Sequence, residues 1–352
     1  MGRGKKKKYL PVGSGDVSFG LSLPHTCLLI LGIYVYSRFP HLPGGDTGEL
    51  LAEACHLGTA HPPGYPLFTI LYHFFMRLSP LPPATTANLI SCLQGALAAY
   101  FIGRTVSVLL GREGAASSLA AVFFALSPLT WEYSVGAEVF CLNNLLISVV
   151  IFLTTCICSN EYDNKDKLRC AKLGAFVSGL CLSNQHTSLL FLLVLIPVVY
   201  SKIYDIQPAI FTLKTLSLFF LLGLSPYIYL CYASSPHDGS WGDLSSIDGF
   251  IKHLTRSEYG SLKLAPTDRG AQEVPLERIW IWLIDLRSRQ IGYIGVAAAV
   301  VGLSRSAVNR QLGKQLTPLL LTLVFYTVIW NFVFSNLPLD NSVPMAFEVH
   351  SR

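Results

Sequence analysis

The chain is 352 residues long, 51% of them hydrophobic and 13% charged, and its formal net charge is +5. So high a hydrophobic share with so few charges excludes a soluble enzyme of this size and predicts an all-α polytopic membrane protein. The nine cysteines are odd in number and lie mostly in apolar runs, so they predict neither a disulfide framework nor a zinc site.

The first 20 residues are basic and contain the lysine run Lys5 to Lys8. A nucleic-acid-binding patch is one interpretation of this run, but lysines ahead of an apolar segment are typical of a cytosolic topology signal. The first apolar run, about Leu21 to Phe39, is long and does not end in small residues, so it is predicted to be a membrane span and not a cleavable signal. The loop after it is then luminal or extracellular.

That loop, residues 43–66, concentrates acid and base in an apolar chain, with Asp46, Glu49, Glu53, His56 and His61. One interpretation is purely local, because Asp46 followed by Glu49 fits a capping box at a helix start. The other is a functional site. A helix over residues 47–57 would place the carboxylates on one stripe and the leucines on another, so we expect an interfacial helix with carboxylates in water and leucines in lipid.

The next apolar piece, Tyr65 to Leu78, decides the topology of everything after it. With about 14 residues, and with His73 and Arg77 inside, it is too short and too polar for a normal span of about 20. If it did cross, the basic stretches 165–169 and 304–310 would lie outside, against the positive-inside rule. It is therefore predicted to be a second interfacial helix.

The remaining spans follow from the apolar runs. They are expected at about residues 86–110, 115–129, 139–158, 171–183, 187–200, 211–232, 291–303 and 316–334, which makes about nine spans in a module over residues 21–335. Lysine and arginine then gather in the cytosol, and carboxylates gather in the luminal loops 40–85 and 233–290, with a luminal tail over 336–352. No internal repeat is visible, which weakens a transporter interpretation.

Two further luminal segments are polar. Residues 131–138 carry aromatic side chains typical of interfacial anchors, and Glu132 and Glu138, which are costly to place at a membrane boundary and are therefore candidate site residues. The trio Asn184 to His186 is best interpreted as a hairpin turn between two apolar runs.

The long loop from about Ala233 to Ile279 is the fourth polar segment. It contains Trp241 and then Lys252, Arg256 and Tyr259 at helical spacing. A cationic face of this kind suits a lipid-linked phosphate, because arginine offers a planar fork of donors to phosphate oxygens. An ordinary solvated amphipathic helix has the same pattern.

Together these segments resemble the GT-C class of membrane glycosyltransferases, and within it the endoplasmic-reticulum protein O-mannosyltransferases that modify IPT domains of plexins and certain receptor tyrosine kinases. The resemblance covers essentially the whole chain. It rests on PGGDTGEL at residues 43–50, HPPGYP at 61–66, WEYSVGAEVF at 131–140, WGD at 241–243 and RSEYG at 256–260.

The resemblance implies a GT-C-like helix bundle in the endoplasmic reticulum membrane that moves mannose from dolichyl phosphate mannose to a Ser or Thr hydroxyl, with inversion and without a metal or cofactor. Asp46 would be the general base and Glu49 would orient the base or the acceptor. A carboxylate in a partly dry interface would also be the better base. Candidate donor-binding residues are His61, Glu132, Glu138, Trp241, Lys252, Arg256 and Tyr259.

The implied partners are the lipid bilayer, the lipid-linked donor and luminal acceptor domains of plexins and receptor tyrosine kinases, with no nucleic acid. The family continues beyond the last span seen here, so the chain resembles a truncated or alternatively spliced form. A non-catalytic regulator and a transporter of a polar or lipid-linked solute are the alternatives. A transporter would hold its ionisable residues near the bilayer midplane, whereas here they cluster in loops.

Overall fold

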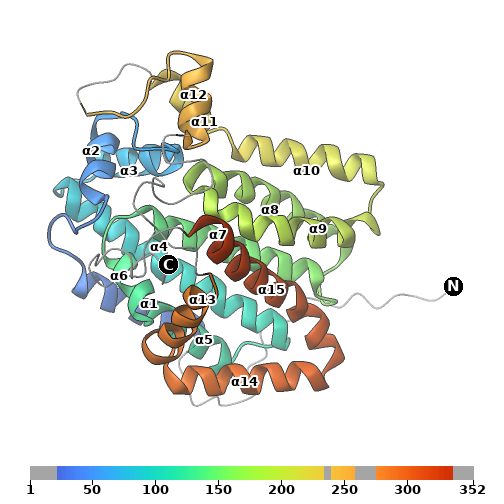
Figure 1. Cartoon of the computed structure of the whole chain (residues 1–352). Helices are drawn as coiled ribbons and strands as arrows, with labels where there is room; N and C mark the ends of the chain where they lie inside the picture. The colour runs from blue at the N-terminus through green and yellow to red at the C-terminus, as the bar shows by residue number, and fades with distance from the viewer. Residues whose placement is uncertain (1–21, 234–238, 258–274, 336–352) are drawn as a thin grey trace.

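The computed structural model describes residues 22–233, 239–257 and 275–335, and every regular element in these ranges is helical (Figure 1). Short 3₁₀ or π-helical turns lie at His186–Ser188, Leu286–Gln290 and Trp330–Phe334. The α-helices are α1 (Leu23–Ser37), α2 (Thr47–His56), α3 (Pro66–Leu78), α4 (Pro83–Leu110), α5 (Ala115–Ala125), α6 (Pro128–Val135), α7 (Val139–Cys158), α8 (Asn164–Asn184), α9 (Leu189–Tyr204), α10 (Ala209–Gly223), α11 (Tyr227–Tyr232), α12 (Ile247–Leu254), α13 (Pro275–Asp285), α14 (Gly292–Val308) and α15 (Arg310–Ile329). The predicted all-α fold class is confirmed for the described residues.

Among the described helices, four are long and apolar enough to cross a membrane: Pro83–Leu110, Val139–Cys158, His186–Tyr204 and Arg310–Phe334. A fifth crossing follows if Pro275–Gln290 and Gly292–Val308, which meet at 109°, form one broken span. The chain is therefore a multi-pass membrane protein. The predicted number of about nine spans includes shorter apolar helices such as α1, α5 and α10, and it stays a prediction.

Two predicted spans are interrupted. The span expected over residues 115–129 is split between α5 and α6 at Pro128, and the one over 211–232 is split between α10 and α11 at Pro226. Proline has no N–H to donate and its ring clashes with the preceding turn, so it starts a helix readily and often interrupts one. The loop predicted over residues 233–290 likewise contains helices α12 and α13 in its described parts.

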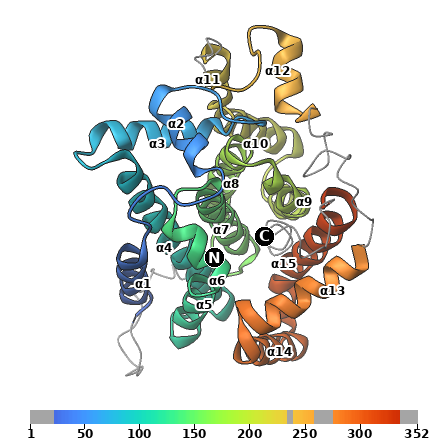
Figure 2. The same ribbon diagram turned by 60° about the vertical axis from the view of Figure 1, so that its left-hand side comes forward.

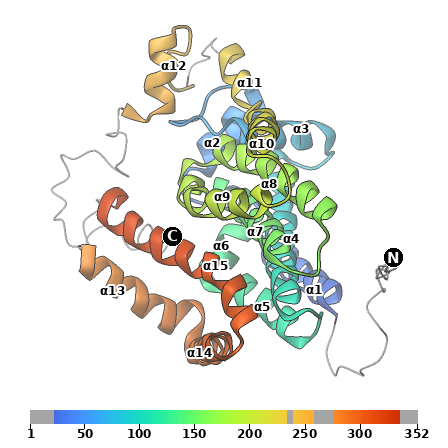
Figure 3. The same ribbon diagram turned by 90° about the vertical axis from the view of Figure 1, so that its right-hand side faces the viewer.

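The bundle is centred on α7, which packs against α4 on one side and α8 on the other. The core between α7, α8 and α9 contains buried side chains such as Leu142 and Leu146 of α7 and Leu192 of α9. Helix α8 meets α10 at Gly179 and Gly223, where a Cβ on either glycine would overlap the backbone of the other helix. Small residues allow this close approach in membranes, where burial of apolar surface from water does not drive helix association. Helices α13, α14 and α15 form a group at one side of the bundle (Figure 3).

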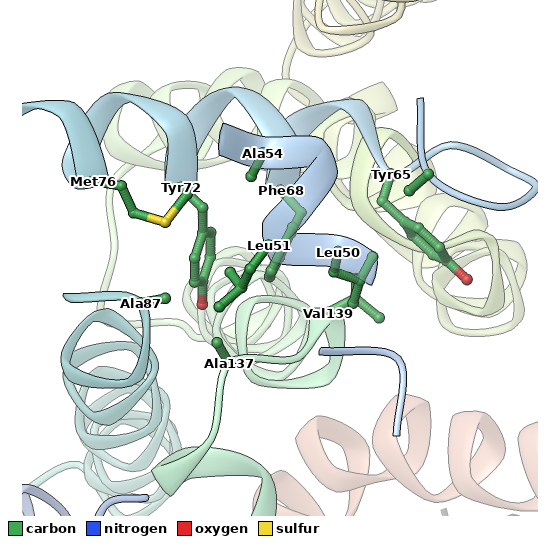
Figure 4. Packing of buried hydrophobic residues seen from close by; sticks show 11 residues of the cluster. Leu50, Leu51, Ala54, Tyr65, Phe68, Tyr72, Met76, Ala87, Ala137 and Val139 are labelled. Carbon is green, nitrogen blue, oxygen red and sulfur yellow. The ribbon is translucent and has the colours of Figure 1, made fainter. Parts of the chain in front are cut away.

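Helices α2 and α3 lie at the end of the bundle that also carries α11 and α12 (Figures 1 and 2). Both occur where the sequence predicted them, yet α2 faces differently. Leu50 and Leu51 are 1% and 3% exposed and pack against Phe68 of α3 and Val139, so they face protein and not lipid (Figure 4). Glu53 is only 3% exposed, so not all carboxylates of α2 face water. The predicted orientation of α2 was wrong because α3 folds over its leucine stripe.

Candidate active site

The polar segments that the sequence singled out lie together, although they are far apart in the chain. The Asp46 N–H donates to Glu138 Oε1 over 3.1 Å, which joins the first loop to the segment before α7. The Trp241 N–H donates to the Thr59 carbonyl over 2.9 Å, which joins the first loop to the segment before α12. Asn184 donates to the Val139 carbonyl over 3.0 Å and ends α8 beside α7, as expected for a turn.

Asn88, near the start of α4, holds together the two chain segments that lead to Asp46 and Glu138. Its amide Nδ2 donates to the carbonyls of Phe39 (2.8 Å) and His41 (2.9 Å). Its Oδ1 accepts from the Ala137 N–H (3.0 Å), and the side chain is fully buried. One amide thus satisfies three backbone groups: the buried Ala137 N–H and the carbonyls of two residues, Phe39 and His41, whose side chains are exposed. Asn88 was not singled out from the sequence, although a polar residue inside an apolar span signals such a role.

Asp46 does not cap α2 with its side chain. Its backbone is helical (φ −82°, ψ 0°), whereas a capping residue is typically extended, and its carboxylate makes no capping hydrogen bond. Glu138 instead accepts from the Asp46 N–H and, over 3.5 Å, from the Thr47 hydroxyl. Gly45 has φ +70°, and a Cβ there would lie 3.0 Å from Glu138 Oε1, so glycine is what lets this carboxylate reach the helix start. The local capping interpretation is therefore wrong, and the Asp46 carboxylate is left for another task.

The Asp46 side chain is 59% exposed. The described residues leave this carboxylate largely uncovered, so burial within the protein is not what would make it a base, and the partly dry interface stays a prediction. One ionisable neighbour is His61, whose Nε2 lies 3.9 Å from Asp46 Oδ2. By contrast, the side chains of Glu53 and Glu138 are buried.

Glu49 holds His61 and does not complete a capping box. Its Oε1 accepts the His61 backbone N–H over 2.6 Å, and its two oxygens lie 3.1 and 3.0 Å from His61 Nδ1. Burial raises the pKa of the Glu49 carboxyl, but the hydrogen bonds and charge of His61 outweigh this and keep that pKa below its ordinary value. The other ring nitrogen, Nε2, is 3.2 Å from the hydroxyl of Tyr65.

Arg256 approaches this group from the loop after α12. Burial raises the pKa of the Tyr65 hydroxyl, and the positive charge of Arg256 opposes that rise, so the guanidinium lies near enough to act on this side chain. Arg256 is half-buried and has φ +55°. A non-glycine residue in this left-handed conformation is uncommon and marks a position that the surrounding structure imposes.

The predicted helical face of Lys252, Arg256 and Tyr259 does not form. Helix α12 ends at Leu254, so the left-handed Arg256 leaves the helical stripe. Lys252 instead pairs with Asp248 one turn earlier, over 2.6 Å and on an exposed surface. Tyr259 lies outside the described residues. Arg256 is thus the cation of this set that the structure brings to the site.

Trp241 covers one side of His61. It is 38% exposed, and its ring centroid lies 6.3 Å from that of His61 in an edge-on arrangement. Its position depends on Ser240, which donates to the buried Glu53 over 2.7 Å and accepts from the Thr59 N–H over 3.3 Å. Ser240 was not singled out from the sequence, because only its partner, 187 residues away, gives it a role.

Glu132 and His253 differ from expectation in opposite ways. Glu132 is exposed on α6, and Glu138 of the same segment is the buried partner of Asp46. His253, not singled out from the sequence, is 5% exposed, and its Nε2 would lie 3.1 Å from a Cβ at Gly64. Burial lowers the pKa of His253 to about 4, so it adds no positive charge near neutral pH. Within the described ranges, no group of three His, Cys, Asp or Glu residues could hold a metal ion.

The arrangement thus offers an exposed carboxylate beside a histidine that is oriented by a second carboxylate, with an arginine close by. A carboxylate of this kind can take a proton from a hydroxyl, and a guanidinium can stabilise an anionic leaving group. No step needs a redox-active or nucleophilic side chain.

The comparisons with known proteins point the same way. Residues 46–207 match the family model described as the Protein O-mannosyl-transferase TMEM260 N-terminal domain. The mouse Protein O-mannosyl-transferase TMEM260 is 42% identical over 234 residues, which are 65% of this chain and 33% of that protein. Its Dictyostelium discoideum counterpart is 34% identical over 334 residues, 88% of this chain and 39% of that protein.

The chain thus spans only about a third to two fifths of the length of these relatives. No solved structure matches it. The family match begins at Asp46 and includes Glu49, His61, Asn88 and Glu138, and with them most of the cluster described above. Residues 46–207 of the chain are thus similar to the N-terminal domains of the protein O-mannosyl-transferase TMEM260 family.

Proposed function

We propose that the chain carries the catalytic centre of a protein O-mannosyltransferase, which moves mannose from dolichyl phosphate mannose to a Ser or Thr hydroxyl of a protein acceptor. The observation that carries this proposal is the exposed Asp46 carboxylate, released from capping by Glu138 and placed beside His61. The printed names of the two relatives support the reaction class.

In this reaction the acceptor oxygen attacks the anomeric carbon of mannose from the face opposite the phosphate. The bond between that carbon and the phosphate oxygen breaks, and its electron pair leaves with the dolichyl phosphate. The acceptor proton passes to Asp46, which acts as general base. The configuration is inverted. The leaving phosphate needs no acid, because a cation such as Arg256 can stabilise its charge.

The setting follows from the same chemistry. A lipid-linked donor requires the site to lie at a membrane surface, and a secretory-pathway acceptor requires it to face the lumen of the endoplasmic reticulum. The N-terminus would then be cytosolic, with Lys5 to Lys8 on that side. The acceptors would be IPT domains of plexins and receptor tyrosine kinases.

The direct test is transfer of radiolabelled mannose from dolichyl phosphate mannose to purified acceptor domains by microsomes expressing this chain. Transfer above that of microsomes without the chain is expected. Absence of transfer with every acceptor would favour a non-catalytic regulator, and uptake of a polar solute by vesicles holding the chain would favour a transporter.

Topology gives an independent prediction. Acceptor tripeptides for N-glycosylation introduced at residues 40–42 and 239–241 are expected to be modified, and one introduced at residues 163–165 is not, because basic loops stay in the cytosol. Gel mobility before and after glycosidase treatment measures this. Modification at 163–165 without modification at 40–42 would contradict the orientation.

Arg256→Lys tests the proposed phosphate contact. Lysine keeps the positive charge and makes the same demand on the backbone at this position, but it lacks the paired N–H groups of a guanidinium. The KM for dolichyl phosphate mannose should therefore rise roughly tenfold, and the KM for the protein acceptor should change little. Steady-state kinetics with each substrate varied in turn measures both.

The matched control is Lys252→Ala, which removes a neighbouring cation that pairs only with the exposed Asp248. We expect its two KM values to stay within about twofold of the parent, as is usual for exposed ion pairs of small energy. Equal effects of both substitutions on the donor KM would place the phosphate elsewhere.

A further inference from the structure

His61 is held in one tautomer. Its Nδ1 lies 3.1 and 3.0 Å from the Glu49 carboxylate oxygens, and its backbone N–H donates to Glu49 Oε1. An ionised carboxylate accepts hydrogen bonds and has no proton to donate, so Nδ1 carries the hydrogen. The neutral ring therefore has its lone pair on Nε2.

The Nε2 side of the ring carries the Tyr65 hydroxyl and, at a longer distance, the carboxylate of the proposed base. Nε2 lies 3.2 Å from the Tyr65 hydroxyl, which donates to it, and 3.9 Å from Asp46 Oδ2. The side chain is 13% exposed, with Trp241 edge-on at 6.3 Å. If Nε2 gained a proton, the resulting imidazolium ring would lie between two carboxylates, with Glu49 at Nδ1 and Asp46 on the Nε2 side.

We propose that Glu49 and His61 form a proton relay that takes from Asp46 the proton which Asp46 removes from the acceptor hydroxyl. The proposal rests on the proposed function. The acceptor O–H bond breaks as the proton joins Asp46; the new O–H bond on Asp46 then breaks as the proton joins His61 Nε2. Asp46 is returned to its carboxylate form, and the imidazolium releases the proton to water. No atom changes oxidation state.

The charges around His61 suit this task. Asp46 and Glu49 both stabilise the imidazolium. His253 faces His61 from α12 and stays neutral near pH 7, while Arg256 lies near enough to act on Tyr65. Glu49 has its pKa held down by His61, so it stays ionised and orients the ring without taking the proton itself. Glu49 is a positioning residue, and His61 is the residue that exchanges a proton with Asp46.

Two matched substitutions separate the relay from a structural role. His61→Asn retains a donor where Nδ1 meets Glu49 but has nothing at Nε2, whereas His61→Gln places an amide near Nε2 that cannot titrate. In mannosyl transfer by the full chain in microsomes, both should lower kcat by about 10- to 100-fold, near the lower bound for proton transfer by a side chain, and leave the donor KM within about twofold. His41→Asn, at an exposed histidine of the same loop, is the control and should leave kcat unchanged.

The pH profile gives the readout that a structural role would not move. If a histidine exchanges the proton, kcat should depend on pH in the parent chain, and His61→Asn should abolish that dependence. Glu49→Gln should move it to lower pH, because a neutral amide stabilises the imidazolium less than a carboxylate does. Diethyl pyrocarbonate, which acylates the unprotonated Nε2, should by the same reasoning modify His61 at lower pH in Glu49→Gln than in the parent, as measured by mass spectrometry.

The outcomes distinguish the relay from the function beneath it. An active parent with an inactive Asp46→Asn variant, but parental kcat and pH profile in His61→Asn, would overturn the relay and leave the proposed function standing. A raised donor KM with an unchanged pH profile would make His61 a donor contact instead. An inactive parent would remove the proposed function and the relay with it. If diethyl pyrocarbonate modified His61 over the same pH range in Glu49→Gln as in the parent, the relay would be overturned without any measurement of mannosyl transfer.

Discussion

Asp46→Asn is expected to lower mannosyl transfer by at least about 100-fold, the lower bound for loss of a general base, and to leave the fold intact. Asparagine has nearly the shape of aspartate but cannot accept the acceptor proton. The fold should survive because the Asp46 carboxylate is 59% exposed and makes no capping hydrogen bond, while the contact of Glu138 runs to the Asp46 backbone N–H. Transfer assays and size-exclusion chromatography in detergent measure the two effects.

Asp248→Asn is the matched control, because it removes an exposed carboxylate at the same end of the molecule that pairs only with Lys252. Its transfer should stay within about twofold of the parent, as expected for an exposed ion pair. Asp46→Ala should be as well folded as Asp46→Asn, since neither loses a cap. If Asp46→Asn transferred mannose at the parental rate, or if Asp46→Asn and Asp248→Asn lost transfer equally, Asp46 would not be the base.

The helices at this site could be predicted because their signals are local. The Gly44-Gly45 break sets the start of α2, and Pro66 begins α3, so both helices occur within a residue or two of the predicted ranges. The meeting of the polar segments was also predictable, because the hydropathy pattern placed all of them at one side of the membrane. Periodicity sets which residues share a stripe. It does not say what that stripe faces.

What the sequence could not supply are contacts whose partners are distant in the chain. Glu138 accepts from the Asp46 N–H although the two residues are 92 positions apart. The sequence of residues 46–49 fits a local capping box, and it gives no sign that the carboxylate at the start of α2 comes from Glu138 instead. The separation of Arg256 from Lys252 depends on one left-handed residue after α12, which helical spacing cannot anticipate. A pairing of Lys252 with Asp248, in contrast, is local and follows from their four-residue spacing.

Asn88→Leu is the substitution with the largest expected effect on stability. Leucine has a similar volume but leaves the buried Ala137 N–H and the part-buried Phe39 and His41 carbonyls without this partner. The buried N–H left unpaired costs about 1–3 kcal/mol and the two carbonyls add to this, so the loss is a large fraction of the free energy of unfolding of a typical domain. We expect most of the variant to aggregate on extraction, as thermal unfolding in detergent followed by fluorescence-detected chromatography would measure.

Gln94→Leu separates this effect from the loss of any buried amide. Gln94 lies on the same helix and is also buried, yet its Oε1 accepts only from the Tyr72 hydroxyl (3.0 Å), which keeps a second contact to Ser91 Oγ (2.8 Å). Gln94→Leu should lower the free energy of unfolding by the contribution of one hydrogen bond, about 1 kcal/mol. If Asn88→Leu were no worse than Gln94→Leu, the Asn88 clamp would not hold the chain segments on either side of the site. A folded Asn88 variant that has lost transfer would show the clamp acting on the placement of Asp46 and Glu138, because the two segments it joins are those that carry these carboxylates.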